Sequence, residues 1–383
     1  MEANVSPTVA KQILGWRHHL HACPELSFEE VETSQFVQAR LNELGIPFEA
    51  DIGGFGVVAT LRRGSSNRSV GLRADMDALP ITEESSLPHA SRRKGIMHAC
   101  GHDGHTAALL GAAALLAQDA DWSGTIQLIF QPAEERGAGA KAMIADGLFE
   151  RFPMERLFAF HNWPGLETGV VAIHDGPVFA EGCRLTITID GLAGHAAMPH
   201  LARDTVLAAA HLIVAAQSVV ARRANPLDAA VLSIGAIEGG AAGNQLPSSV
   251  KMSGTIRTYR SAVRDHMIGE VKRIAEGIAR SFDVTVNVDV VVGGPAVANS
   301  REDSNFAAQV AEKAGLPVRW NVPPSMAAED FGRYLDHRPG AYVWIGNGVE
   351  SASLHHPRYE FNDAILPIAA SYLSKLAIAA LGR

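Results

Sequence analysis

Residues 69–77 have the sequence Ser-Val-Gly-Leu-Arg-Ala-Asp-Met-Asp, six mostly apolar positions followed by two carboxylates, Asp75 and Asp77. Because polar and apolar side chains barely alternate from Ser69 to Ala74, these six residues are typical of a β-strand covered on both faces. Three later segments share the pattern: Thr125 to Phe130, Leu157 to Phe160 and Gly169 to Ile173. Helical patterns accompany them at 8–22, 29–44, 104–119 and 137–147. This alternation predicts an α/β fold with a mostly parallel central sheet flanked by helices.

The order of the predicted strands and helices changes between residues 180 and 292. The expected elements are strand 184–190, helix 203–223, strands 229–237 and 250–259, helix 262–281 and strand 284–292. This βαββαβ order is that of a ferredoxin-like α+β domain. Polar and apolar residues alternate in its strands, so one face of the sheet should be wet or pair with another chain.

After Gly293-Gly294-Pro295 the α/β pattern returns. It contains helices at 301–314, 327–336 and 363–381 and strands at 317–321 and 341–346. Residues 1–179 and 293–383 should therefore form one domain, with residues 180–292 inserted in it as a second domain.

Composition supports two domains and excludes several classes of function. The chain has 383 residues, and single cores stop growing at roughly 250–300. Its net charge is −8 and its basic run Arg92-Arg93-Lys94 is short, so nucleic acid is not an expected partner. With no basic and apolar leader, no apolar run of about eighteen residues and only three scattered cysteines, a soluble cytoplasmic protein without a membrane partner is expected.

The densest cluster of reactive side chains is MHACGHDGH at residues 97–105. Cys100 and His102 stand two residues apart around a glycine, so both can reach one ion. Thiolate and imidazole suit zinc and its first-row neighbours. A buried, inert thiol is the alternative for Cys100 alone, but the surrounding histidines favour a metal. For His98 and His105 a structural role, as a loop histidine and a helix-start residue, remains open.

Two adjacent carboxylates, Glu134 and Glu135, follow the strand that ends at Phe130. Neighbouring side chains in extended backbone point in opposite directions, so one can bind metal while the other faces the substrate water. Such pairs are usually solvated, but this one lies at the carboxyl end of a buried strand, where α/β proteins bind ligands. Three further residues end or follow strands in the same way: Asp75, His161 and His355. A lone histidine there is more often structural, and it is their convergence that predicts a site.

The inserted region contributes polar residues near turns or in a strand: His195, Asn244 and Arg257. They suit the binding of an oxyanion or a carboxylate. Ordinary turn residues and a solvated strand arginine explain the same pattern equally well, so the residues alone do not decide between the two interpretations.

In their order along the chain these segments resemble the M20 metallopeptidase family, in particular its amidohydrolase branch of hippurate hydrolases, bacterial aminoacylases and plant auxin-conjugate hydrolases. The resemblance covers nearly the whole chain. Its motifs are HLH (19–21), PELSFEE (24–30), GLRADMDALPI (71–81), MHACGHDGHTA (97–107), FQPAEE (130–135), HNWP (161–164), GHAAMPH (194–200), NQLP (244–247), GTIRT (254–258), AAEDFGRY (327–334) and LHHPRYEFND (354–363).

The resemblance implies that residues 1–179 and 293–383 form a metal-binding domain and that the inserted residues 180–292 form a lid domain. It also implies two divalent ions, zinc, manganese, cobalt or nickel, and a homodimer formed through the lid domain. By resemblance the metal ligands are Cys100, His102, Glu135, His161 and His355. Glu134 matches the general base of the family, and Asp75 a carboxylate behind the metals, although Arg73 stands where the peptidase branch has a histidine. The lid residues implied are His195 for the oxyanion, often across the dimer, and Asn244 and Arg257 for the α-carboxylate of the substrate.

Together these residues predict a metal-dependent amidohydrolase that cleaves a small N-acyl amino acid into a carboxylic acid and a free amino acid. Glu134 would take a proton from the attacking water and return it to the leaving nitrogen. A dipeptidase or carboxypeptidase with the same site is one alternative. A binding or sensing protein that has lost catalysis is another, although Glu134 beside a full set of ligands argues against it.

Overall fold

The computed structural model describes residues 5–320 and 322–382, which form two compact units. Residues 1–4 and 383, at the ends of the predicted domain ranges, and residue 321, the last of the predicted strand 317–321, lie outside this description. Unit 1 extends to Val178 and resumes with Val297–Pro324 and from Glu329 onwards, whereas unit 2 comprises Phe179–Ala296 and Ser325–Ala328. The short segment of unit 2 beyond residue 324 was not expected.

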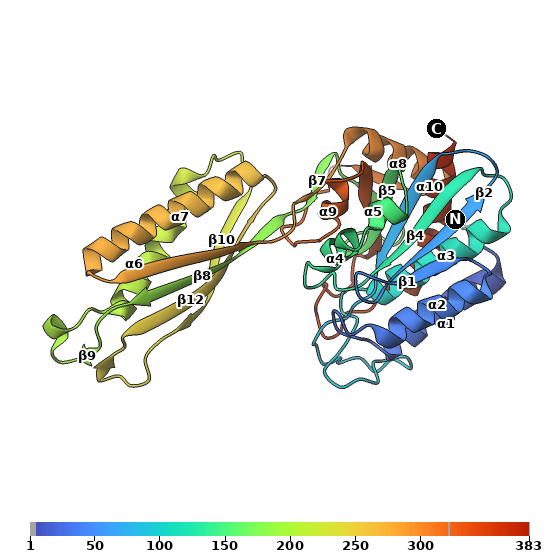
Figure 1. Cartoon of the computed structure of the whole chain (residues 1–383). Coiled ribbons are helices and arrows are strands. Elements are labelled where there is room, and N and C mark those ends of the chain that lie inside the picture. Colours follow the sequence, from blue (N-terminus) through green and yellow to red (C-terminus); the bar gives the residue numbers. More distant parts are fainter. Residues whose placement is uncertain (1–4, 321, 383) are drawn as a thin grey trace. The chain divides into compact units, whose positions relative to one another are not determined.

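Unit 1 is built on an eight-stranded sheet with the order β1-β2-β4-β3-β5-β16-β6-β15 (Figure 1). The strands are β1 Phe48–Ile52, β2 Gly56–Arg63, β3 Ser69–Asp75, β4 Gly124–Gln131, β5 Arg156–Pro164, β6 Val171–Ile173, β15 Val318–Trp320 and β16 Gly340–Gly348. The central strands β4, β3, β5 and β16 are parallel, while β1 and β2 form an antiparallel edge. The predicted mostly parallel central sheet is therefore confirmed, and its antiparallel edge was missed.

Helices flank this sheet in unit 1. They are α1 Pro7–Ala22, α2 Val31–Glu43, α3 His102–Gln118, α4 Gly139–Ala145, α5 Leu148–Arg151, α8 Arg301–Lys313, α9 Gly332–Leu335 and α10 Leu366–Leu381. A short pair of strands, β7 Gly176–Phe179 and β14 Val297–Asn299, lies apart from the main sheet. The predicted helix 327–336 is wrong over its first half, because only Gly332–Leu335 is helical.

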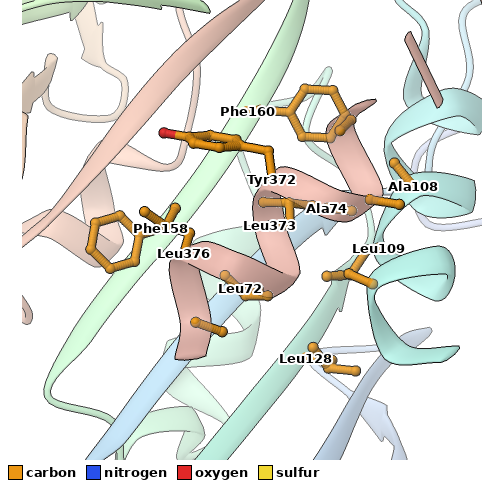
Figure 2. Close-up of a cluster of buried hydrophobic side chains, with 14 of the residues drawn as sticks. Leu72, Ala74, Ala108, Leu109, Leu128, Phe158, Phe160, Tyr372, Leu373 and Leu376 are labelled. Carbon is orange, nitrogen blue, oxygen red and sulfur yellow. The ribbon is translucent and has the colours of Figure 1, made fainter. Parts of the chain in front are cut away.

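The core of unit 1 lies between the central strands and the helices α3 and α10. Figure 2 shows Leu373 and Leu376 of α10 beside Leu72 of β3, Phe158 of β5 and Leu109 of α3. All five side chains are almost fully buried, and burying each one stabilises the fold by about 1.5–3 kcal/mol. This packing holds the sheet and the start of α3 in fixed relation, and the candidate site is built on both.

Unit 2 is a four-stranded antiparallel sheet with the order β10-β12-β8-β13. Its elements are β8 Glu181–Asp190, α6 Thr205–Ser218, β10 Ala230–Glu238, β12 Ser249–Thr258, α7 Ser261–Phe282 and β13 Thr285–Val292. A short pair, β9 Gly194–His195 and β11 Gln245–Leu246, lies apart from it. Alternate residues of β8 point into a core that they share with α6 and α7.

Among the described residues, two segments are long and apolar enough to cross a membrane by length and composition, Thr205–Arg223 and Asp363–Leu381. The second contains α10, and 67% of its apolar window is buried inside the structure, as in the core helix of a soluble protein. Only 33% of the first window is buried. The exposed side of this segment carries apolar side chains, among them Leu207 and Val214.

Candidate metal centre

The carboxyl ends of the central strands of unit 1 carry a cluster of residues with metal-binding side chains. Its members are Cys100 and His102 at the start of α3, Glu134 and Glu135 after β4, His161 on β5 and His355 after β16. Within each of three groups the ligand atoms lie within 4.8 Å of one another: Cys100, His102 and His161; Cys100, Glu135 and His355; and His102, Glu134 and Glu135. Because the groups share members, they form one continuous cluster.

The distances in this cluster fit bound cations better than a hydrogen-bonded network. Cys100 Sγ lies 3.5 Å from His161 Nε2, and His355 Nε2 lies 3.4 Å from Glu135 Oε1. His102 Nε2 is 3.9 Å from the same Glu135 oxygen. His102 Nε2 and Glu135 Oε1 are both buried, and neither atom has a hydrogen-bond partner among the described residues. Buried polar atoms without a partner destabilise a fold, and a cation between them would satisfy both.

The orientation of two histidine rings is set by backbone carbonyls. His102 Nδ1 lies 2.9 Å from the carbonyl oxygen of Asp77, and His161 Nδ1 lies 2.7 Å from that of Asn162. A carbonyl oxygen can only accept, so Nδ1 carries the hydrogen in each ring and the lone pair is on Nε2. In both rings Nε2 belongs to the cluster, which is the arrangement of a metal-ligating histidine.

Asp77 holds the turn that carries the two glutamates. Its carboxylate accepts hydrogen bonds from the amides of Glu134 and Glu135, each at 3.0 Å. Ala133, just before them, has a φ of 53° and donates its amide to Glu30 at 2.7 Å. A non-glycine residue in this region costs about 1–3 kcal/mol, so such contacts are needed to keep the turn in place.

Asp77 was not predicted as a site residue. A signal for it was present in the sequence, because Asp75 and Asp77 are two residues apart after an extended strand and can therefore point the same way. Its bonds to the two glutamates, however, join segments 57 and 58 residues apart, and no local pattern reports such a contact.

Asp75 lies behind the cluster and supports it. Its Oδ1 is 2.6 Å from His105 Nδ1, and its Oδ2 is 3.8 Å from His102 Nε2. The Oδ2 atom also accepts a hydrogen bond of 2.8 Å from Arg73, whose buried guanidinium binds Glu329 at 2.9 Å as well. His105 therefore has a supporting contact in the site, and Arg73 offsets part of the negative charge of Asp75 and Glu329.

Glu134 has the environment of a base. Oxygen atoms of Glu134, Glu329 and Asp330 lie within 4.8 Å of one another. Burial, followed by the negative charges of Glu329, Glu135 and Asp330, raises the pKa of Glu134 well above its usual range. Bound cations act in the opposite direction. A carboxylate that takes up a proton readily is suited to general base catalysis.

The remaining three predicted residues belong to unit 2. His195 and Asn244 are exposed and lie on neighbouring segments, since Ala196 donates its amide to the carbonyl of Asn244 at 3.0 Å. The ring of His195 accepts the Ala197 amide at Nδ1, at 3.1 Å, so its hydrogen is on Nε2. Arg257 is half-buried on the central strand β12. The seven residues of unit 1 are thus brought together, and those of unit 2 form a separate set.

Residues 71–379 match the model of peptidase family M20/M25/M40. The chain belongs to this family. The resemblance found from its motifs is therefore confirmed.

Named relatives of this M20 protein act on acylated amino acids. It is 42% identical to the N-acetyl-L-cysteine deacetylase of Bacillus subtilis, over 95% of this chain and 87% of the relative. It is 40% identical to the hippurate hydrolase of Campylobacter jejuni, over 94% of each chain. A crystal structure of a dinuclear metal-binding M20 peptidase from Bacillus subtilis is 32% identical, with a TM-score of 0.87 over 98% of this chain and 99% of that one.

Cys100→Ser tests the fit of the cluster to metal. We expect zinc affinity to fall at least tenfold, because a hydroxyl is a poor substitute for a thiolate toward borderline cations. Chelator competition on the metal-free protein measures this change. Cys183→Ser, another buried free cysteine but in unit 2, should bind zinc like the natural protein. Equal zinc affinity in both variants would show that Cys100 is an inert core thiol.

Proposed function

We propose that this chain is a two-metal amidohydrolase that cleaves N-acyl amino acids into a carboxylic acid and a free amino acid. The observation that carries the proposal is the buried Glu134 beside a cluster of sulfur, nitrogen and oxygen ligands. In two of its histidines, His102 and His161, the nitrogen with the lone pair lies in the cluster. The names of the two relatives, a hippurate hydrolase and an N-acetyl-L-cysteine deacetylase, support this substrate class.

Five residues would hold two divalent ions: Cys100, His102, Glu135, His161 and His355. A thiolate with three imidazoles suits zinc, cobalt or nickel, and the carboxylate also admits manganese. When bound, two such ions lower the pKa of a water molecule and polarise the substrate carbonyl.

The chain's own residues supply the proton transfers. Glu134 takes a proton from the attacking water as the bond from water oxygen to carbonyl carbon forms. His195, with its hydrogen on Nε2, donates to the oxyanion that results. Glu134 then gives its proton to the leaving nitrogen as the carbon–nitrogen bond breaks. Asn244 and Arg257 bind the α-carboxylate of the amino acid.

The acyl group of the substrate would contact the side chain of Trp163. This partly exposed indole lies two residues beyond His161 on β5, with its ring centroid 5.9 Å from the imidazole. Its face stacks on the buried Trp344 at 3.7 Å, which fixes its orientation. An aromatic acyl group, as in hippurate, would gain from contact with such a surface.

Unit 2 offers a surface for a homodimer. Three apolar side chains on the outer side of α6 are exposed: Val206 by 43%, Leu207 by 48% and Val214 by 75%. β10, at one edge of the sheet, adds Ile237. An exposed apolar helix beside an open strand edge is typical of a protein–protein interface. We propose that two copies pair there and that His195 serves the partner's site.

The proposed location is the cytoplasm. The three cysteines are free, and a thiolate ligand keeps its metal-binding form in a reducing compartment. A dipeptidase or carboxypeptidase is the alternative function, because the similar crystal structure is that of a peptidase.

Glu134→Gln separates proton transfer from metal binding. We expect the variant to keep both metal ions while turnover of N-benzoylglycine falls by about 10²–10⁴-fold, the usual contribution of general acid–base catalysis. Metal content and initial rates are measured on the same samples. Glu135→Gln should instead lose metal. The opposite pattern, with metal lost only in the Glu134 variant, would mean that the two roles are reversed.

Trp163→Leu tests the acyl side. We expect kcat/KM for N-benzoylglycine to fall about 30-fold, since aromatic contact and the area it buries are each worth about 1 kcal/mol. The value for N-acetylglycine should stay unchanged. Trp320→Leu, at a partly exposed tryptophan of β15, is the matched control. An equal loss for both substrates would exclude an acyl-specific contact.

Mixing His195→Ala and Glu134→Ala subunits tests the shared site. Alone, the histidine variant should lose about 10²–10³-fold in rate, as for a missing oxyanion donor. In hybrid dimers one of the two sites has both natural residues, so mixtures should regain part of the activity. If mixtures that demonstrably exchange subunits regain none, His195 does not act across the dimer.

A further inference from the structure

Arg17 is a buried cation that contacts two parts of the chain next to metal ligands: the start of α3 and the segment that follows His355. Its side chain, on α1, has no exposed surface. Nε donates to Asp103 Oδ2 at 2.9 Å, while Nη1 donates to Glu360 Oε1 at 2.7 Å and to Asp363 Oδ1 at 3.1 Å. None of these carboxylates is a proposed metal ligand, but each lies close in sequence to one.

Asp103 connects Arg17 to the start of α3. It follows the proposed ligand His102 directly, in the first turn of that helix. Its Oδ2 also lies 2.8 Å from Nδ1 of the buried His21. His21 is one helical turn beyond Arg17 on α1, so both side chains project from the same face. Two groups on α1 therefore hold the helix end from which Cys100 and His102 project.

Glu360 and Asp363 connect Arg17 to the segment that carries His355. Residues 349–362, after β16, contain no helix or strand. His355 has a φ of 64°, a conformation that costs about 1–3 kcal/mol in a non-glycine residue. Side-chain and loop contacts must therefore hold this segment in place. Arg17 supplies two of them, and His355 adds one by donating its amide to Ala99 O at 2.8 Å.

We infer that Arg17 is a positioning residue for the metal centre, because it joins the start of α3 to the His355 segment. It touches neither metal ligand nor reacting atom, so its role is to set the spacing of ligands that are far apart in the sequence. Supporting residues of this kind typically change metal affinity by about 10–100-fold when replaced. The inference rests on the proposed two-metal function.

The test replaces Arg17 by lysine. Lysine keeps the charge but lacks the planar fork that reaches several carboxylates at once. In the metal-free full-length protein, competition with a chelating indicator should show zinc binding weakened by about 10–100-fold for at least one of the two ions. At saturating zinc, kcat should remain within a few-fold of the natural value, because the chemical groups are intact.

Arg156→Lys is the matched control. Arg156 pairs with Glu302 and, at 3.1 Å, with Asp303, which makes it another arginine between two carboxylates. It is the first residue of β5, at the end of that strand away from the ligand His161. We expect this variant to lower the thermal midpoint of the metal-free protein and to leave both zinc affinities unchanged. The comparison separates loss of stability from loss of ligand spacing.

Glu360→Gln is the second arm and does not depend on a change at the fully buried arginine. The Glu360 side chain is 32% exposed, so the variant should fold. It removes the charge of one of the two carboxylates that bind Arg17 on the His355 side, and the Asp363 contact remains. The variant should therefore weaken the binding of one of the two zinc ions selectively. If Arg17→Lys and Glu360→Gln both keep natural zinc affinities, the inference is overturned and Arg17 is merely structural. If the protein with its natural sequence binds no zinc, the proposed function itself is contradicted.

Discussion

The hydrogen bonds of Asp77 are the interaction on which the candidate site most depends. Its carboxylate holds the amides of Glu134 and Glu135, and its backbone carbonyl orients His102. One residue thus joins the end of β3, the turn after β4 and the start of α3. These three points meet because β3 and β4 are parallel neighbours whose carboxyl ends lie at the same edge of the sheet. The proposed base and two ligands are therefore placed by one anchor.

Buried charge is the second constraint on this end of the sheet. Arg73 is surrounded by Asp75, Glu329 and Asp330, and oxygen atoms of the last two lie close to Glu134. A single guanidinium cannot balance all of these carboxylates. Burying so much negative charge is unfavourable unless further cations are present. The electrostatics of the supporting residues and the chemistry of the ligands thus favour the same conclusion, a centre that takes divalent ions.

Much of this architecture could be predicted from local patterns, because buried parallel strands have a distinct composition. The strand expected to end at Ala74 ends at Asp75, one residue later. The expected helix 327–336 is mostly absent, since Glu329 points inward to the buried Arg73 in place of a regular solvated turn. Asp77 was missed for a related reason. Its function arises from contacts between distant segments, which neither periodicity nor motif spacing encodes.

The central claim is that the cluster binds two divalent ions and uses them to hydrolyse N-acyl amino acids. It is tested most directly by stripping the protein of metal, titrating zinc back and recording bound ions and released amino acid together. Acetyl, benzoyl and indoleacetyl amino acids, with dipeptides for comparison, form the substrate panel. We expect activity that requires two ions per chain and that is higher for N-acyl substrates than for dipeptides. The claim would be contradicted if the protein binds two zinc ions but releases no amino acid from any substrate of the panel, or if it is fully active without metal.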